Sequence, residues 1–279
     1  AAATSTLKLT TSTDALVGGA GDDTASGVLQ GEGETGTTVA PGDSIDGKAG
    51  TDTFTISVAG EVDTAAYTLS AVTLDNVEKL FLSNFDTHAN AHTVEAGLMT
   101  GLTTVGLSAS SGDGDTTING LKNNVDAEMR NGSADLTLTY NGSYAVTGTA
   151  DTQNLTVSAL TAGTFTSDGI ETLNINSLGD LVLRDNTNKL SNLTSVNINS
   201  QTANKTVDLT SLTTTATALV TDGITINVRG AGNANIGVDT NFGTYNATSN
   251  PDKVTINATG SGDISVLYNN YSANTIITG

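Results

Sequence analysis

Apolar residues alternate with polar residues along most of this chain. Ile, Leu, Val or Phe occupy every second position in many short runs, for example residues 52–58, 78–84, 171–177 and 194–200. A period of two indicates a β-strand with one buried face. Clusters of Gly, Asn, Asp, Ser and Thr separate the runs, and these residues favour turns. The pattern therefore predicts an all-β protein built from short strands.

Helical periodicity is weak by comparison. It occurs in residues 92–102 and 123–132, which have room for one or two helical turns.

Three segments repeat one frame, in which a loop residue and an apolar residue precede an alternating strand. They are "LDNVEKLFLSN" (74–84), "SDGIETLNINS" (167–177) and "LSNLTSVNINS" (190–200). Strands recur roughly every 20 residues, the spacing expected of solenoid coils. In a parallel β-solenoid each coil buries its apolar row against the coils above and below. An antiparallel sandwich is the alternative, but the repeated frame favours a parallel β-helix, or β-solenoid.

The composition agrees with a thin, repetitive core. Hydrophobic residues make up 37% of the 279 residues and aromatic residues only 4%. The core must therefore consist of Val, Ile, Leu and Thr rather than large rings. Cysteine is absent, which excludes disulfides and thiolate metal sites.

The net charge of −19 limits the partners that the chain can bind. Nucleic acids and anionic membranes are disfavoured, because both require clustered cations. No run of 18 apolar residues is present, so membrane insertion is not expected. The first residues have neither the charged nor the apolar region of a signal peptide, and we expect both ends to have been cut from a longer chain.

Two blocks near the N-terminus repeat Gly and Asp in one frame. "GGAGDDTAS" (18–26) matches the nonapeptide G-G-x-G-x-D-x-U-x, in which U is apolar. "GKAGTDTFT" (47–55) matches it with Lys48 in place of the second glycine, and this lysine either points outward or weakens the block. The key glycines and aspartates are Gly18, Gly21, Asp23, Gly47, Gly50 and Asp52.

Each block follows a shorter copy of itself. Asp14 precedes the first block and Asp43 the second, in both cases nine residues before the aspartate of the block. Calcium takes about six to eight oxygen ligands in flexible geometry, and glycine lets the backbone turn its carbonyl groups inward. The blocks therefore predict calcium sites in a segment formed by residues 1–60, with residues 61–279 continuing the same stack. Two glycine-rich turns with solvated aspartates are the alternative.

Other residues are weaker candidates for binding a metal ion. Asp113 and Asp115 flank a glycine and fit a calcium loop and a plain turn equally well, whereas Asp168 precedes the phrase "GIET" and is assigned to calcium. His88 and His92 lie four residues apart, as in some zinc sites, but no third ligand is near. We therefore expect a solvated loop there.

The chain resembles the RTX-type, calcium-binding S-layer proteins of Gram-negative bacteria. The resemblance rests on "TDALVGGAGDDT", "GDSIDGKAGTDTF" and the phrase "GIETLNI" at 169–175. It implies a secreted β-solenoid that binds calcium and assembles with copies of itself into a lattice on the cell surface. Lys48 and the small number of repeats depart from the pattern.

The expected function is therefore structural: a calcium-dependent, self-assembling, extracellular cell-surface protein. The main alternative is an adhesin or glycan-binding segment of a large secreted RTX protein. Expected partners are further copies of the chain, and lipopolysaccharide or another cell-surface glycan. A polysaccharide lyase or hydrolase is a third reading, but no convergent set of Lys, Arg and Asp is visible among the 10 cations, so we expect no enzyme activity.

Overall fold

The computed structural model describes residues 2–30, 35–58, 67–86, 91–142, 146–161, 163–167, 169–183, 193–209, 224–238, 253–268 and 274–279. Within these residues the protein consists of strands, apart from one short 3-10 helix, η1 (Ala96–Leu98). The chain divides into two compact units, residues 1–145 and 146–279.

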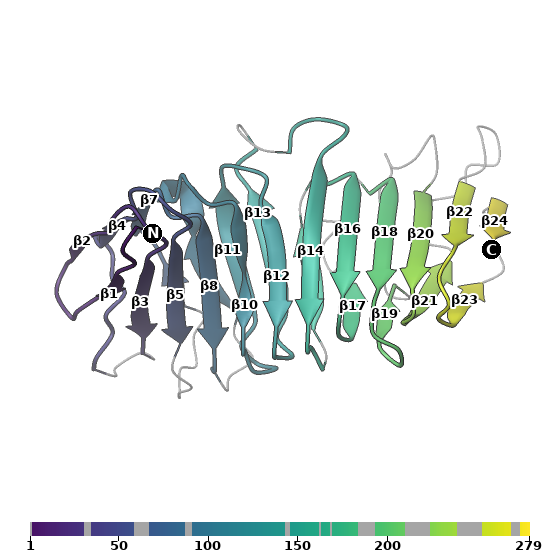
Figure 1. Ribbon diagram of the computed structural model, residues 1–279, viewed down its shortest axis with the longest axis horizontal. Coiled ribbons are helices and arrows are strands. Elements are labelled where there is room, and N and C mark those ends of the chain that lie inside the picture. Colours follow the sequence, from purple (N-terminus) through teal and green to yellow (C-terminus); the bar gives the residue numbers. More distant parts are fainter. Residues whose placement is uncertain are drawn as a thin grey trace. The chain divides into compact units, whose positions relative to one another are not determined.

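Unit 1 contains three sheets of parallel strands, with β3, β5, β8 and β10 lying side by side in Figure 1. The first sheet has the order β1 (Thr6–Lys8), β3 (Thr24–Leu29), β5 (Thr53–Val58), β8 (Lys79–Asn84), β10 (Thr104–Ser108) and β12 (Asp126–Arg130). The second has β6 (Thr68–Leu69), β9 (His92–Glu95), β11 (Thr116–Leu121) and β13 (Leu136–Tyr140). The third has β2 (Ala15–Val17), β4 (Ser44–Asp46) and β7 (Thr73–Asp75).

Unit 2 has two sheets of the same kind. One has the order β14 (Thr152–Ser158), β16 (Thr172–Ser177), β18 (Ser195–Ser200), β20 (Ile224–Gly230), β22 (Lys253–Ala258) and β24 (Asn274–Thr278). The other has β15 (Thr164–Ser167), β17 (Leu181–Leu183), β19 (Thr206–Asp208), β21 (Asn233–Val238) and β23 (Ile264–Tyr268).

The alternating sequence explains why these strands stack. In β5 the burial pattern alternates residue by residue, and Phe54 and Ile56 are completely buried. The same alternation buries Leu173 and Ile175 of β16, which lie in register with Val196 and Ile198 of β18. Each apolar residue thus stacks on its equivalent in the next coil, and Thr and Asn point outward.

The predicted β-solenoid is confirmed. The strand pairings within the described residues are parallel, which excludes the antiparallel sandwich for them. Coil length varies: equivalent positions are 29 residues apart at Asp23 and Asp52 but 20 apart at Asp151 and Glu171. A backbone bulge in β11 accommodates an irregular coil.

The two segments with weak helical spacing fold differently from each other. Residues 92–102 contain β9 and the single helical turn η1, whereas residues 123–132 contain strand β12 and no helix. Stacking of Ala127 and Met129 onto Val105 and Leu107 of β10 explains the strand, because both pairs are buried. No described helix is long and apolar enough to cross a membrane.

Candidate metal centre

Acidic side chains form a column in unit 1, at the residues directly before β3, β5 and β8. The backbone N–H of Ser5 donates to Asp23 Oδ1, and the N–H of Asp23 donates to Asp52 Oδ1 at 2.6 Å. The N–H of Asp52 in turn donates to Glu78 Oε2 at 2.7 Å. We call Asp23, Asp52 and Glu78 the acid ladder. Each carboxylate satisfies a backbone donor of the preceding coil, so the column holds adjacent coils together.

A second, shorter ladder precedes β2 and β4. The N–H of Thr10 donates to Asp14 Oδ2 at 2.6 Å, and the N–H of Asp14 donates to Asp43 Oδ1 at 2.9 Å. The other oxygen of Asp43 accepts from the N–H of Ala40 at 2.7 Å. The structure therefore places Asp14 and Asp43 in one ladder, and Asp23 and Asp52 in another.

One carboxylate oxygen of the acid ladder, Oδ2 of Asp52, is buried without a hydrogen-bond donor in the described part of the chain. Asp23 uses both oxygens, because Oδ2 accepts from the N–H of Gly19. Asp52 Oδ2 is buried and accepts no hydrogen bond from any described residue, and the residue is only 2% exposed. A buried carboxylate oxygen without a donor is costly, so this atom is the strongest indication that the acid ladder binds a cation.

At two block glycines, a ladder carboxylate oxygen and a backbone carbonyl oxygen of the next coil occupy the space that a side chain would need. A Cβ atom on Gly47 would lie 2.3 Å from Asp52 Oδ2 and 2.2 Å from the carbonyl oxygen of Asn76 in the next coil. The same holds one coil earlier, where a Cβ on Gly18 would lie 2.3 Å from Asp23 Oδ2 and 2.7 Å from the carbonyl oxygen of Gly47. Only glycine fits at either position.

Gly21 and Gly50 allow the coils to approach each other. A Cβ on Gly50 would lie 2.6 Å from the carbonyl oxygen of Gly21, and one on Gly21 would lie 2.6 Å from that of Ala3. Gly50 also has φ of +141°, which side chains rarely adopt. These two glycines therefore serve close packing of the backbone.

The electrostatic environment differs between the two aspartates. Hydrogen bonds from the backbone of Gly19 and then Ser5 lower the pKa of Asp23 below its ordinary value of 3.8. Burial, reinforced by the nearby carboxylates of Glu78, Asp23 and Asp22, raises the pKa of Asp52 above the same value. Asp52 thus carries its negative charge at a cost that a cation would remove.

Lys48 does not supply that positive charge to Asp52. Its Nζ lies 2.6 Å from Asp46 Oδ2, and its side chain is 53% exposed. Its backbone has φ of +73°, which explains why the motif has glycine at this position. The lysine therefore points outward, which is the first of the two possibilities that the sequence left open for it.

The donor set at Asp52 fits a hard cation in part. Asp52 Oδ2 and the Asn76 carbonyl offer the oxygen ligands that calcium prefers. Across the part of the chain that the structure describes, however, no three His, Asp, Glu or Cys side chains are arranged to hold a metal ion together. Any ion here would depend largely on backbone oxygens and water.

The remaining sequence candidates have other positions. Asp115 precedes β11 and accepts from the N–H of Asp135 at 2.9 Å. Burial raises its pKa, and the carboxylates of Asp135 and Asp113 add to the effect. Asp113 is exposed, and Asp168 lies outside the described residues.

Sequence reasoning missed Glu78 and the carbonyl of Asn76 as parts of this site. Both lie in "LDNVEKLF", a coil without the glycine block. The structure identifies Glu78 through register, because Lys79 pairs with Thr53 and the residue before it therefore stacks on Asp52.

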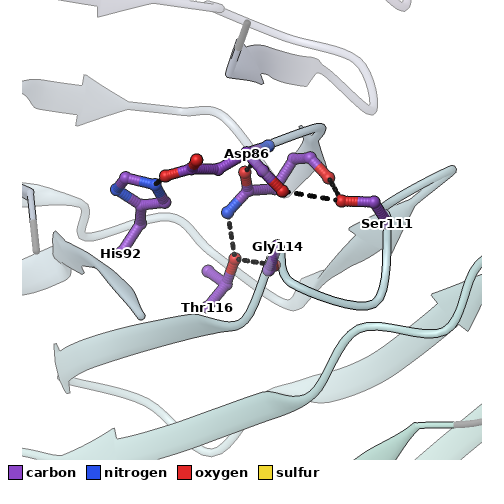
Figure 2. A network of polar contacts seen from close by, with 6 residues as sticks. Asp86, His92, Ser111, Gly114 and Thr116 are labelled. Carbon is purple, nitrogen blue, oxygen red and sulfur yellow. Dashed lines mark hydrogen bonds and ion pairs between the residues drawn. The ribbon is translucent and has the colours of Figure 1, made fainter. Parts of the chain in front are cut away.

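A separate buried polar network surrounds His92 in unit 1 (Figure 2). His92 Nε2 lies 2.5 Å from Asp86 Oδ2, and both residues are at least 95% buried. Asn84 Nδ2 donates to Thr116 Oγ1 at 3.3 Å, and the hydroxyl of Ser111 donates to the Asp86 carbonyl at 2.9 Å. His92 is thus a buried strand residue and not part of the solvated loop expected from the sequence, while His88 lies outside the described residues.

Comparisons with protein-family models, with curated proteins and with solved structures found no match.

Proposed function

We propose that this chain is a structural protein: a calcium-dependent β-solenoid that self-assembles on the outer surface of a cell. The observation that carries the proposal is the buried Oδ2 atom of Asp52, which accepts no hydrogen bond from the described residues. The carbonyl oxygen of Asn76 is a second oxygen beside the same glycine, Gly47. Asp52 and Asn76 would hold the ion, and calcium would supply the positive charge that the acid ladder lacks.

The overall charge supports a link between calcium and folding. The chain carries 29 acidic and 10 basic residues, so self-repulsion opposes the compact state. An ion that binds only the folded coils stabilises them by mass action. Extracellular calcium sites work at about 0.1–1 mM, which fits a protein that folds outside the cell.

The fold supports the structural part of the proposal. A parallel solenoid exposes long regular faces rather than a closed cleft, and such faces suit extended contacts. The S-layer role and the secretion that it requires rest on the resemblance of the glycine blocks to that family.

The test is a calcium titration of the wild type and of Asp52→Asn, followed by circular dichroism and light scattering, with EGTA reversal. In calcium we expect wild-type strand signal, melting temperature and particle size to rise. In EGTA, Asp52→Asn should be about 1 kcal/mol more stable than wild type, because the neutral amide removes a buried negative charge that lies near the carboxylates of Glu78 and Asp23. In calcium it should gain less than half of the wild-type increase in melting temperature.

Asp75→Asn is the matched control, because it removes the same charge from an exposed residue, at the end of strand β7. It should respond to calcium as the wild type does. Magnesium at the same concentration separates binding from charge screening, since magnesium is smaller and demands stricter geometry. Equal calcium responses in the wild type and Asp52→Asn would refute the site. Folding with calcium but without association would refute self-assembly and favour the adhesin alternative.

A further inference from the structure

One face of unit 2 carries a continuous row of asparagines. Outward residues of five neighbouring strands bond in series: Asn174 donates to Asn154 at 3.0 Å, Asn197 to Asn174 at 2.8 Å, Asn227 to Asn197 at 2.7 Å and Asn257 to Asn227 at 2.7 Å. We call these five residues the amide ladder. The sheet surface that they share with the outward residues beside them is the asparagine face.

The side chains of the amide ladder hydrogen-bond to one another with only part of their donors and acceptors, which leaves polar capacity for a partner. A side-chain amide has two N–H donors and a carbonyl oxygen with two lone pairs. Each internal rung uses one donor and one acceptor site for its neighbours in the ladder. Strand spacing of about 4.8 Å holds the rungs in a fixed, regular array. The face is therefore rigid before any partner binds.

The rest of the face differs from the chain as a whole in lacking described acidic residues, and its described charged side chain is that of Arg229 in β20, an exposed residue in register with Asn199. Thr152, Thr172, Ser195, Thr225 and Thr255 form the row beside the amide ladder. No Asp or Glu occupies an outward position of β14, β16, β18, β20, β22 or β24 among the described residues. In the same row as Thr255 lies Ile276 of β24, which is 43% exposed.

We propose that the asparagine face is the surface through which two copies of this chain contact each other, an inference that rests on the proposed self-assembly. Two copies that each carry a charge of −19 repel one another wherever carboxylates meet. This face presents no described carboxylate, so two copies can approach there without that repulsion. Flat sheets bearing asparagine ladders pack face to face in cross-β assemblies, and a two-fold contact would use the same face twice.

The test adds one charge to the face without removing a ladder bond. Thr225 lies between Ser195 and Thr255, outside the amide ladder. In calcium, Thr225→Glu and Thr225→Lys should each need at least tenfold more protein to associate, measured by sedimentation velocity. A mixture of the two variants should regain association, because opposite charges then meet. Ser265→Glu is the control, since Ser265 is an exposed residue of β23 in the other sheet, and it should associate as the wild type does.

Circular dichroism and melting temperature confirm that each variant is folded before the comparison is made. Unchanged association of either folded Thr225 variant, or no recovery in the mixture, would overturn the asparagine face as the contact. Wild-type protein that stays monomeric in calcium would instead overturn the proposed self-assembly and the inference with it. Binding of a neutral polysaccharide by such a monomer would assign the face to a glycan.

Discussion

The acid ladder of unit 1 and the amide ladder of unit 2 are both columns of like residues stacked on neighbouring coils, yet they are stabilised differently. Ionised carboxylates only accept hydrogen bonds, so Asp23 and Asp52 depend on backbone donors, and their Oδ1 atoms take these from the preceding coil. Amides both donate and accept, so Asn174, Asn197 and Asn227 bond to one another. A column of acids therefore needs donors or cations from outside the column, whereas a column of amides supplies its own donors.

The two columns also place different demands on the backbone around them. In the acid ladder, Asp52 Oδ2 and the Asn76 carbonyl oxygen both lie within 2.3 Å of the place where a Cβ of residue 47 would be, so only glycine fits there. The amide ladder lies on an open sheet face and depends on register alone, as shown by the alignment of Asn174 with Asn197. An asparagine can therefore be added to the amide ladder wherever the register is kept, whereas the acid ladder also requires glycine at a fixed position in the coil.

The largest effect should come from breaking the close approach in the acid ladder. Gly47→Ala places a Cβ 2.2 Å from the Asn76 carbonyl oxygen, so the coils must shift apart. We expect a loss of about 2–3 kcal/mol in the free energy of unfolding, measured with urea in the presence of calcium. The control is Gly97→Ala, where no atom lies within 4 Å of the added Cβ; it should change stability by less than about 0.5 kcal/mol. Equal effects of the two substitutions would contradict the steric argument.

A smaller effect should follow when an acid is placed in the amide ladder. Asn197→Asp still accepts from Asn227 but no longer donates to Asn174 at neutral pH. We expect a loss of about 1–2 kcal/mol by urea unfolding at pH 7. The loss should shrink at pH 3, because a protonated carboxyl can donate again.

Asn204→Asp makes the same chemical change at an exposed loop position with φ of +63°. Aspartate tolerates that backbone conformation, so this control should stay near wild-type stability. If Asn197→Asp were as stable as the control at pH 7, the bonds of the amide ladder would contribute nothing to the fold.

Much of the fold could be predicted from the sequence, because burial in a solenoid follows a simple period. The alternation in residues 52–58 and 171–177 predicts strands that the structure contains as β5 and β16. Residues 123–132 show the limit of this reasoning. Their weak helical spacing is local, whereas the strand β12 is determined by stacking on the buried Val105 and Leu107 of the neighbouring coil.

The site could be predicted less completely. The glycine blocks point to Asp23 and Asp52, but the motif does not reveal that the acids bond to backbone N–H groups of the preceding coil. Glu78 belongs to the same column although its coil has no glycine block. Its role depends on which coil lies next in space, and coil length varies too much for a fixed repeat to show it.

The smallest expected effect is a difference in pKa between the two aspartates of the acid ladder. It compares two members of the same column directly. Backbone hydrogen bonds lower the pKa of Asp23, so its contribution to stability is present above the ordinary value of 3.8 and is lost as the pH falls through the lower, folded pKa. Burial raises the pKa of Asp52, so its charged form opposes folding at neutral pH, and stability from this residue increases as the pH falls through its raised pKa. Carbon-detected NMR of the carboxyl groups in EGTA should therefore show Asp52 titrating at a higher pH than Asp23. Calcium should lower the apparent pKa of Asp52 toward that of Asp23, because the cation competes with the proton for Oδ2. An Asp52 that titrates together with Asp23 in EGTA would mean that its second oxygen has a donor in solution, and the acid ladder would then need no cation.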